Sequence, residues 1–455
     1  MEPDARAKLK DWLATGKARL EPLSFPQREL WEASAVAPGD PSNNICCLLD
    51  IRGPLTEAMC RESLGHVLAH QEVMRASFLP GKERPLQVVK SEADPRLRYR
   101  VLPSSVRTAE AVLCEVQECF SQPLDLLRGP LYRIEMLKRG PDHHVLALAI
   151  HHSIADGWTV SNFVNDFTTG CLLAWQKSGN DTSRLKALRL DFAPLEMTCA
   201  QWAANERARW NPEALEKQAG YWRRRLEGAR PFLRGRGPLQ PLPLACRRTE
   251  IPAALAEPVR GLAKKSGATL FSVLLALFRV ALFRWSGQED VVVGTPVAGR
   301  TGQAVREAMG YFSGTVPLRG RLDPDRPFDA MVAEIHRQSV DDFANAMPFA
   351  ELAAAVGRGG GTHPVFDVRF AVQNYPAPGI DIPGIGSRLE LVSSGTARFD
   401  IGCEMTEDGR KLELRWLHRP DALAGSDLAD LDRIFRGVIG EAGRHPTACP
   451  ADLKI

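Results

Sequence analysis

The sequence predicts an α/β fold, in the sense of an α+β sandwich, because helical and strand-like signals alternate in both halves of the chain. Residues 56–69 have helical periodicity, with one apolar face made of Cys60, Leu64, Val67 and Leu68. Residues 145–150 (VLALAI) form a wholly apolar run, which is typical of a strand covered on both faces. Mixed signals of this kind argue against a helical bundle and an all-β barrel.

Three further segments fit the same class. Residues 290–293 (DVVV) and 365–372 (VFDVRFAV) are predicted strands. Residues 270–283 (LFSVLLALFRVALF) contain Arg279 and are too short to span a bilayer, so we predict a buried helix and no membrane span. Residues 1–20 mix charges throughout and lack the continuous apolar core of a secretory signal.

Composition narrows the class of protein. A chain of 455 residues suggests two or three domains at about 150 residues each. With 44% hydrophobic and 25% charged residues, disorder, collagen and a small disulfide scaffold are excluded. The net charge of +3 gives no reason to expect a nucleic-acid partner. The 10 cysteines form no C-x-x-C pair, which favours structural thiols in the cytoplasm.

Three stretches interrupt the regular pattern: residues 177–182 (KSGNDT), 230–243 (RPFLRGRGPLQPLP) and 357–364 (GRGGGTHP). The first divides the chain into an N-terminal part, residues 1–180, and a larger C-terminal part, residues 181–455. The basic stretch at residues 223–236 is either a solvated helix end and linker or a contact for an acidic carrier protein or a phosphate.

The segment that carries chemistry is HHSIADGW at residues 151–158, directly after the predicted buried strand. Three residues separate His152 from Asp156, so the carboxylate can turn back beneath the loop and fix its shape. Gly157 permits a positive φ and close approach of a substrate to its N–H, and a helix is expected from about Thr159. A histidine is suited to moving a proton near neutral pH.

Two other interpretations of these histidines are open. The segment can be a merely packed loop, or His151, His152 and Asp156 can be metal ligands. We predict no metal site, because adjacent strand histidines diverge and no further histidine or cysteine pair lies at ligand spacing. His143 and His144 precede the strand in a polar turn (PDHH) and are predicted to be solvated.

HHSIADGW resembles the H-H-x-x-x-D-G signature of condensation domains of nonribosomal peptide synthetases, and its inner half also resembles chloramphenicol acetyltransferase. The resemblance runs nearly end to end. In family order it also covers residues 23–31 (LSFPQ and LW), 70–78 (HQEVMRASF), 221–226 (YW and L), 293–300 (VGTPVAGR), 309–316 (MGYFSGTV), 348–349 (PF), 363–374 (HPVF through QN) and 398–400 (RFD). Phe25, Pro26 and Gly314 depart from the residues usual in the family.

The resemblance implies two acetyltransferase-like lobes in a V-shaped pseudo-dimer, here residues 1–180 with the HHxxxDG motif and residues 181–455, with the active site in a tunnel between them. It also implies roles. His152 orients the acceptor amine or takes its proton, and Gly157 offers its N–H to the oxyanion. Asp156 is a structural carboxylate paired across the lobes with Arg300, and His151 supports the loop. Trp158, Ser313 and Asn374 are expected to bind substrate or support the site, with core packing equally open for Trp158.

The implied activity is that of an acyltransferase of the EC 2.3.1 type, which forms an amide between a thioester-bound acyl donor and the amine of an aminoacyl carrier protein. No G-x-S-x-G elbow is present, and an activated thioester needs no covalent enzyme nucleophile. Substrates would arrive on phosphopantetheine or CoA, with no cofactor bound intrinsically. The expected partners are acyl-CoA or a donor carrier protein and an acceptor aminoacyl carrier protein.

The short stretch before the opening motif favours a starter domain that loads a fatty acyl group from acyl-CoA onto the first amino acid in lipopeptide biosynthesis. The alternatives are a free-standing or elongation enzyme with a peptidyl-carrier donor, forming an amide or an ester, and a non-catalytic recruitment platform. Epimerisation relatives share the histidine signature but use no donor. We expect a monomer or a part of a larger synthetase.

Overall fold

The computed structural model describes residues 3–36, 39–82, 84–103, 108–178, 191–233, 242–300, 302–358, 365–373, 381–382, 384–392, 396–397 and 399–454. The predicted site residue Asn374 lies outside these ranges, as do His363, Pro364 and Arg398 of the matching segments. Parts of the three predicted interruptions, residues 179–182, 234–241 and 359–364, also lie outside them.

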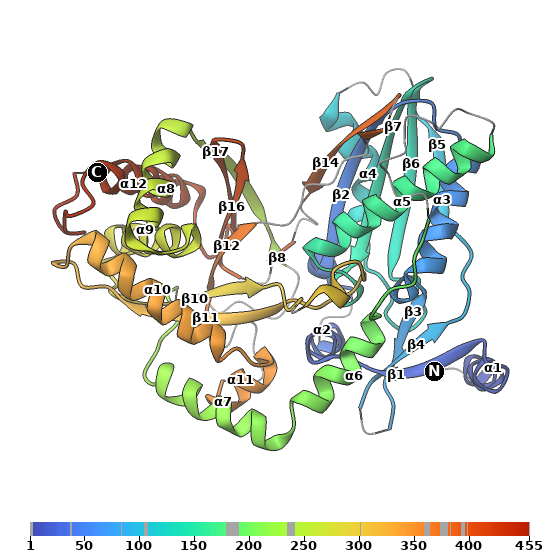
Figure 1. The fold of residues 1–455 in the computed structure, drawn as a ribbon, viewed down its shortest axis with the longest axis horizontal. Coiled ribbons are helices and arrows are strands. Elements are labelled where there is room, and N and C mark those ends of the chain that lie inside the picture. Colours follow the sequence, from blue (N-terminus) through green and yellow to red (C-terminus); the bar gives the residue numbers. More distant parts are fainter. Residues whose placement is uncertain are drawn as a thin grey trace. The chain divides into compact units, whose positions relative to one another are not determined.

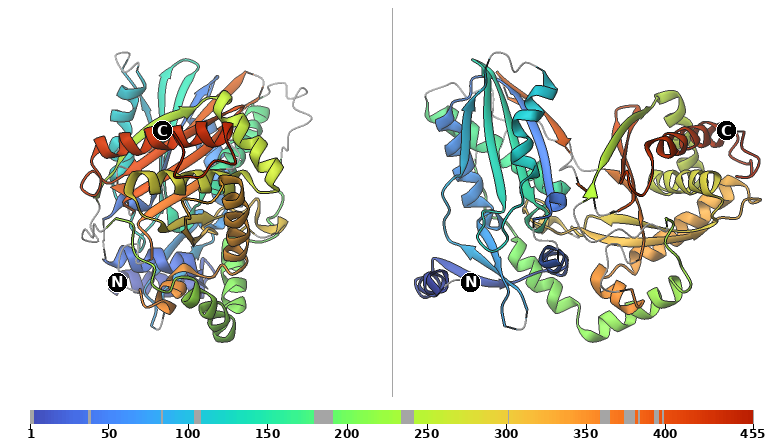
Figure 2. Two further views of the ribbon diagram at one scale, coloured as in Figure 1. Left: turned by 90° about the vertical axis from the view of Figure 1, so that its left-hand side faces the viewer. Right: turned by 180° about the vertical axis from the view of Figure 1, so that it is seen from behind.

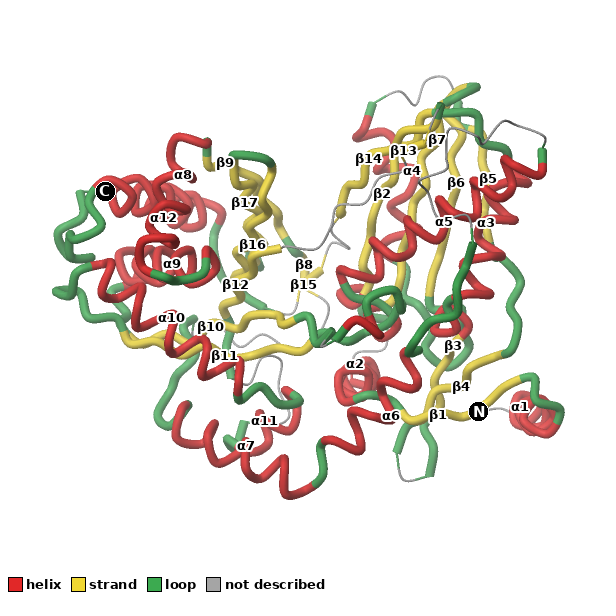
Figure 3. The backbone as a smooth tube through the Cα atoms, in the orientation of Figure 1, coloured by secondary structure: helices red, strands yellow, loops and turns green. Residues whose placement is uncertain are grey.

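The chain divides into two compact units, and each is made from several stretches of sequence. Unit 1 consists of Met1–Trp210, Gly299–Ser313 and Tyr375–Ser394, and unit 2 consists of Asn211–Ala298, Gly314–Asn374 and Gly395–Ile455. Unit 1 therefore continues past residue 180 and takes in two segments from the C-terminal half of the sequence. Helices and strands alternate in both units, as the colours of Figure 3 show.

Unit 1 is built on a six-stranded sheet in the order β13-β14-β2-β7-β6-β5 (Figure 1). Its strands are β2 (Asn44–Arg52), β5 (Leu97–Val101), β6 (Tyr132–Gly140), β7 (His143–His151), β13 (Asp381–Ile382) and β14 (Ile385–Val392). All neighbours are antiparallel except β5 and β6, which are parallel. β7 lies between β2 and β6, so the strand that leads to the histidine motif is central.

Both faces of this sheet are covered, which explains the wholly apolar run at residues 145–150 of β7. On one face, Leu146, Leu148 and Ile150 pack with helices α3 (Glu57–His70) and α5 (Gly157–Lys177). On the other face, Val145, Ala147 and Ala149 pack with α4 (Ala109–Ser121). Two views of these helices and strands are given in Figure 2. The prediction of a strand buried on both sides is therefore confirmed.

Unit 1 also contains a three-stranded sheet, β1-β4-β3, and three further helices. The elements are α1 (Pro3–Ala14), β1 (Ala18–Pro22), α2 (Phe25–Val36), β3 (Ala76–Leu79), β4 (Leu86–Lys90) and α6 (Cys199–Arg209), with one-turn helices η1 (Pro41–Asn43) and η2 (Glu72–Arg75). α2 and α6 contact each other, and α2 also contacts the turn that contains His152.

Unit 2 has a second six-stranded sheet, in the order β11-β10-β12-β16-β17-β9. Its strands are β9 (Ala245–Ile251), β10 (Asp290–Val297), β11 (Gly314–Arg321), β12 (Val368–Gln373), β16 (Ile401–Asp408) and β17 (Lys411–His418), and β8 (Leu242–Pro243) pairs separately with β15 (Thr396–Ala397). Its helices are α7 (Pro212–Arg225), α8 (Ala253–Ser266), α9 (Leu270–Ser286), α10 (Phe328–Ala344), α11 (Phe349–Ala355) and α12 (Gly425–Arg444).

The core of unit 2 is centred on α9, whose residues from Ser272 to Leu282 are all buried. Phe278 stacks on Phe370 of β12 with ring centroids 5.1 Å apart and also contacts Trp416 of β17 and Phe435 of α12. The predicted buried helix is thus confirmed. In the part of the chain that the model describes, no single helix has the length and apolar character to cross a membrane; α8 and α9 meet those criteria only as a pair, bent by 115°.

The mixed fold is confirmed, and so are the helix at residues 56–69 and the strands at 290–293 and 365–372, although β12 begins only at Val368. The placement of His143 and His144 in a turn before the strand is wrong, and so is the solvation of His144. β7 starts at His143, and His144 pairs with Ile51 of β2 and is 0% exposed. The strand begins early because backbone pairing with β2 continues to the end of that strand.

Candidate active site

The histidine motif lies where β7 ends and α5 begins. His151 is the last residue of β7, the 3-10 turn η3 covers His152–Ile154, and Asp156 caps the N-terminus of α5. A strand followed directly by a capped helix leaves a short, closely hydrogen-bonded connection. The two histidines separate as expected, since His151 is 3% exposed while His152 is partly exposed.

The turn is held from within and from a neighbouring helix. The Nδ1 atom of His151 accepts a hydrogen bond from the Ser153 amide at 3.1 Å and lies 2.7 Å from the Ser153 hydroxyl oxygen. The Gln27 side chain of α2, itself 0% exposed, donates from Nε2 to the Ser153 carbonyl at 3.0 Å. Gln27 belongs to the matching segment LSFPQ, but the sequence alone predicts no role for it.

Asp156 is the most heavily bonded residue of the motif. Its Oδ1 accepts from the Thr159 amide at 2.9 Å, which is the helix cap, and from Nη2 of Arg300 at 2.9 Å. Its Oδ2 accepts from Nε of Arg300 at 3.2 Å. The side chains of Asp156 and Arg300 are 1% and 3% exposed. This two-point geometry satisfies both charges away from water.

Arg300 belongs to the segment Gly299–Ser313, so the ion pair is internal to unit 1. Besides Asp156, Arg300 donates from Nη1 to the carbonyls of Val305 and Ala308 and lies over the Phe312 ring at 4.1 Å. The segment therefore folds around the guanidinium.

Two polar residues of α5 fix the same segment. The Thr159 hydroxyl donates to the Gly310 carbonyl at 2.9 Å and accepts from the Gly310 amide at 3.0 Å. Asn162 donates to the carbonyls of Arg306 and Ala308. Gly310 has φ +155, and a Cβ there would lie 2.6 Å from the Cys199 sulfur, so glycine is required.

The segment brings Tyr311 against His152. The two rings meet edge to face, with centroids 4.7 Å apart and planes at 67°. This contact restricts the rotation of the imidazole. Tyr311 was missed as a site residue, although it lies inside the matching segment MGYFSGTV. No local signal in that segment shows that it meets a histidine so distant in the sequence.

Gly157 is the first residue of α5 and does not use the positive φ that glycine permits. The helix starts two residues earlier than expected because the Asp156 side chain caps it. The Gly157 N–H is one of the first four of the helix, which have no partner within the helix, and it lies at the positive end of the helix dipole.

The remaining predicted site residues are less closely tied to the turn. Trp158 is partly exposed in the first turn of α5, and Ser313, also partly exposed, is the last residue of the segment Gly299–Ser313. Cys199 is buried near the motif, and burial raises the pKa of its thiol to about 12. Cys199 is therefore not an activated nucleophile. Across the described residues, no group of three or more His, Cys, Asp or Glu side chains could hold a metal ion.

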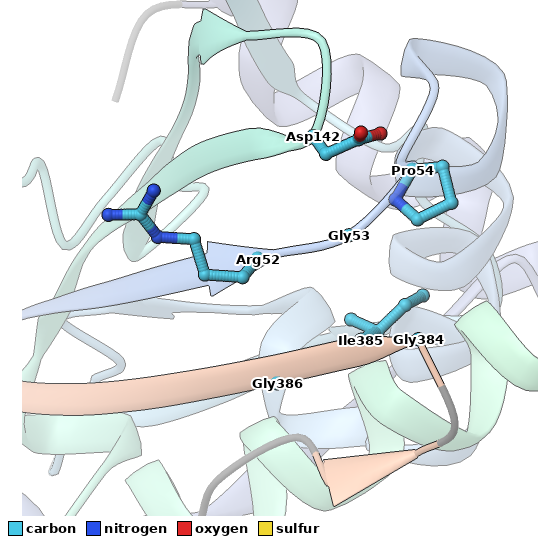
Figure 4. A pocket seen from close by; sticks show the side chains of 7 residues that line it. All are labelled: Arg52, Gly53, Pro54, Asp142, Gly384, Ile385 and Gly386. Carbon is cyan, nitrogen blue, oxygen red and sulfur yellow. The ribbon is translucent and has the colours of Figure 1, made fainter.

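A surface hollow of about 670 Å³ occurs elsewhere in unit 1 (Figure 4). It is lined by Arg52, Gly53, Pro54, Asp142, Gly384, Ile385 and Gly386. β2 and β7 are antiparallel, with Arg52 paired with His143 and Asn44 paired with His151. The hollow is therefore at the opposite end of these strands from His152.

Comparison with known proteins identifies the family. The model of the condensation-domain family matches residues 17–454. The chain belongs to this family. This chain is 33% identical over 403 residues to phosphinothricin tripeptide synthetase PhsC of Streptomyces viridochromogenes. The match covers 85% of this chain and 36% of that protein. It thus spans about a third of this curated relative's length.

Solved structures show the same fold. The first condensation domain of the calcium-dependent antibiotic synthetase, in complex with a substrate analogue, has a TM-score of 0.79 at 21% identity, covering 96% of this chain and 99% of the other. The starter condensation domain of rhizomide synthetase RzmA, a mutant form in complex with C8-CoA, has a TM-score of 0.80 at 18% identity, covering 96% and 97%.

Family membership confirms the predicted fold class and enzyme class. Condensation domains of nonribosomal peptide synthetases catalyse amide-bond formation, which is an acyl transfer. They hold no intrinsic cofactor, and their substrates arrive on the phosphopantetheine of carrier proteins.

Proposed function

We propose that this condensation domain joins a fatty acyl group, delivered as a CoA thioester, to the amine of an aminoacyl group on an acceptor carrier protein. In this reaction the amine nitrogen attacks the thioester carbonyl carbon and a new C–N bond forms. The C–S bond then breaks, and the thiol of CoA leaves with the proton that the amine has lost. The products are an amide on the carrier and free CoA.

The observation that carries the chemistry is the position of His152. Its imidazole is partly exposed and lies in a turn that is held by hydrogen bonds of Ser153, Gln27 and Asp156. The ring of Tyr311 packs against this imidazole. A fixed imidazole next to solvent-accessible space can orient an amine and accept its proton as the tetrahedral intermediate forms.

The other residues act through this arrangement. The Gly157 N–H, at the positive end of α5, would donate to the oxyanion of the intermediate. Asp156 and Arg300 neutralise each other, so they would hold the turn and the segment Gly299–Ser313 without exchanging protons. His151 supports the turn through Ser153. Trp158, Ser313 and Asn374 are proposed to bind substrate or to support the site structurally.

The choice of a CoA donor draws on the starter condensation domain of rhizomide synthetase, which was solved with C8-CoA. The second candidate donor is a peptidyl group on a carrier protein. It is favoured by the 33% identity to a tripeptide synthetase, of which this chain covers only part. The domain would act either as part of a larger synthetase or as a free-standing monomer. The free thiols of all 10 cysteines suit a cytoplasmic location.

The donor is tested by incubating the protein with an aminoacyl carrier protein and a panel of acyl-CoA and peptidyl-carrier donors, followed by intact mass measurement of the carrier. We expect an acyl mass increase with acyl-CoA. Turnover only with peptidyl carriers would refute the starter assignment but retain the condensation activity. Binding of donors without any turnover would refute catalysis and leave a recruitment platform. A hydroxyl acceptor in the panel separates ester from amide formation.

The role of His152 is tested with His152→Ala in the same assay. General-base help from histidine is worth about 10²–10⁴-fold, so a loss of that size is expected. His143→Ala is the matched control, because His143 lies at the other end of β7 and bonds to Asp50 at 2.8 Å. Wild-type turnover of His152→Ala would remove His152 from the mechanism, and an equal loss in His143→Ala would indicate damage to the sheet instead.

A further inference from the structure

Unit 2 contains a buried arginine that forms no direct ion pair with a described carboxylate. Arg279 lies in the middle of the apolar helix α9 and is 5% exposed. Its Nη2 donates to the Leu318 carbonyl of β11 at 2.9 Å. Among the described residues its Nε has no hydrogen-bond partner, and none of the described carboxylates forms an ion pair with it. A buried charge in this state is costly unless something else compensates it.

Loss of the proton does not remove this cost. Burial, with repulsion from Arg225 as a second cause, lowers the pKa of Arg279 to about 10. This value is still well above neutral pH, so the guanidinium stays charged under ordinary conditions. The nearby carboxylates of Asp342 and Asp290 attract this charge and offset part of the effect. Each of them is already paired with another arginine, Asp342 with Arg225 and Asp290 with Arg319, so neither is a dedicated partner of Arg279.

A small cavity lies beside Arg279. It has a volume of about 30 Å³ and is lined by Arg279, Gly320, Arg321, Leu322, Asp323, Arg326, Met331, Glu334, Ile335 and Gln338. A water molecule needs roughly 10–15 Å³ on this measure, so the space fits about two waters or one compact ion. The guanidinium lies directly against Gly320, where an added Cβ would overlap it.

The charges around the cavity leave an excess of positive charge. Its lining holds three arginines and two carboxylates. The Glu334 carboxylate is already engaged, with one oxygen bonded to Arg326 and the other accepting from Gln338 at 2.9 Å. Asp323 is exposed, and water therefore screens its charge. The side chain of Arg321 is 80% exposed and solvated. The charge that is neither paired nor solvated is that of Arg279.

We propose that this cavity binds a compact monovalent inorganic anion of the chloride class, which accepts hydrogen bonds from the Arg279 guanidinium. The anion would complete the set of hydrogen bonds of Arg279 and tie α9 to β11 and α10, the three elements that border the cavity. Unit 2 would then be more stable in chloride than in a bulky anion at the same ionic strength.

Two measurements test the site. In crystals soaked in bromide, an anomalous peak is expected within hydrogen-bond distance of Arg279. In thermal unfolding at constant ionic strength, replacing gluconate with chloride is expected to raise Tm by roughly 2–4 °C at about five times the Kd of the site. Arg279→Met should remove this response. Arg284→Met is the matched control, because Arg284 lies on the same helix and donates to the carbonyls of Pro450 and Ala451.

The possible results either support the anion site or overturn it. A bromide peak together with a chloride response lost in Arg279→Met but kept in Arg284→Met supports the site. A cavity that holds water only, or a chloride response equal in all three proteins, overturns it. Should Arg279→Met fail to fold, Gly320→Ala displaces the guanidinium with a smaller change, and the bromide soak of the unaltered protein still decides. None of these readouts depends on condensation activity.

Discussion

The buried pair of Asp156 and Arg300 allows a quantitative test of how the catalytic turn is held. The informative changes are Arg300→Met, which removes the cation but keeps an unbranched apolar chain, and Asp156→Ser, which removes the anion but keeps an oxygen that can cap α5. Their combination removes both charges. The three variants and the unaltered protein form a double-mutant cycle.

The expected magnitudes follow from burial. Both side chains are nearly inaccessible, at 1% and 3% exposure, so each single change leaves the partner charged and away from water. Such a loss typically costs about 3–5 kcal/mol. Asp156→Ser should fall in this range with little added cost from the cap, whereas removing the cap as well, in Asp156→Ala, adds about 1 kcal/mol. The double variant should cost less than the sum of the singles, since no charge is left unpaired.

The free energy of unfolding is measured in urea. Amide hydrogen exchange of α5 is measured in parallel, because α5 belongs to unit 1 and its exchange reports on that unit alone. The reasoning is refuted if Arg300→Met costs less than about 1 kcal/mol, or if the two single costs simply add in the double variant. Additivity would mean that the hydrogen bonds of each residue to its other partners, and not the pair itself, hold the turn.

Two further predictions concern backbone geometry and pH. Gly299 has φ +62 and a Cβ there would overlap a main-chain carbonyl, so Gly299→Ala should cost about 1–3 kcal/mol and lower the turnover of the acyl donor. Gly16→Ala is the matched control, because Gly16 has a similar φ of +71 but open space around its Cβ position, and it should cost less by the same urea measurement; equal costs would contradict this. Burial raises the pKa of Glu206, which accepts from the Phe25 amide, to about 7. Between pH 4.5 and 7 the folded protein then binds more protons than the unfolded chain, so stability should fall as pH rises through this window. Glu206→Gln should flatten that slope, and an unchanged slope would refute the assignment.

Local patterns were enough to predict the elements that lead to the site. The apolar run of β7 and the spacing of His152 and Asp156 are encoded within a few residues, so the strand, the turn and the capped helix could be anticipated. The predicted solvation of His144 failed because its burial depends on pairing with β2, almost 100 residues earlier in the chain. Single-residue polarity cannot report such a partner.

The long-range contacts of the site could not be predicted from local sequence patterns for the same reason. Gln27 and Tyr311 lie far from the motif in sequence, and only the folded chain shows that one bonds to the turn and the other packs on His152. The resemblance to a family supplied Arg300, but not the fact that its segment belongs to unit 1.

This discontinuity has a consequence for how the protein is made. Asp156 and Arg300 are separated by 144 residues, so at roughly 5–20 residues per second the ribosome needs about 7–30 s after producing the carboxylate to supply its partner. The strand β14, which pairs with β2, emerges later still. Most of the polypeptide must therefore be translated before the histidine turn can acquire its final support, and a fragment ending near Trp210 would lack both.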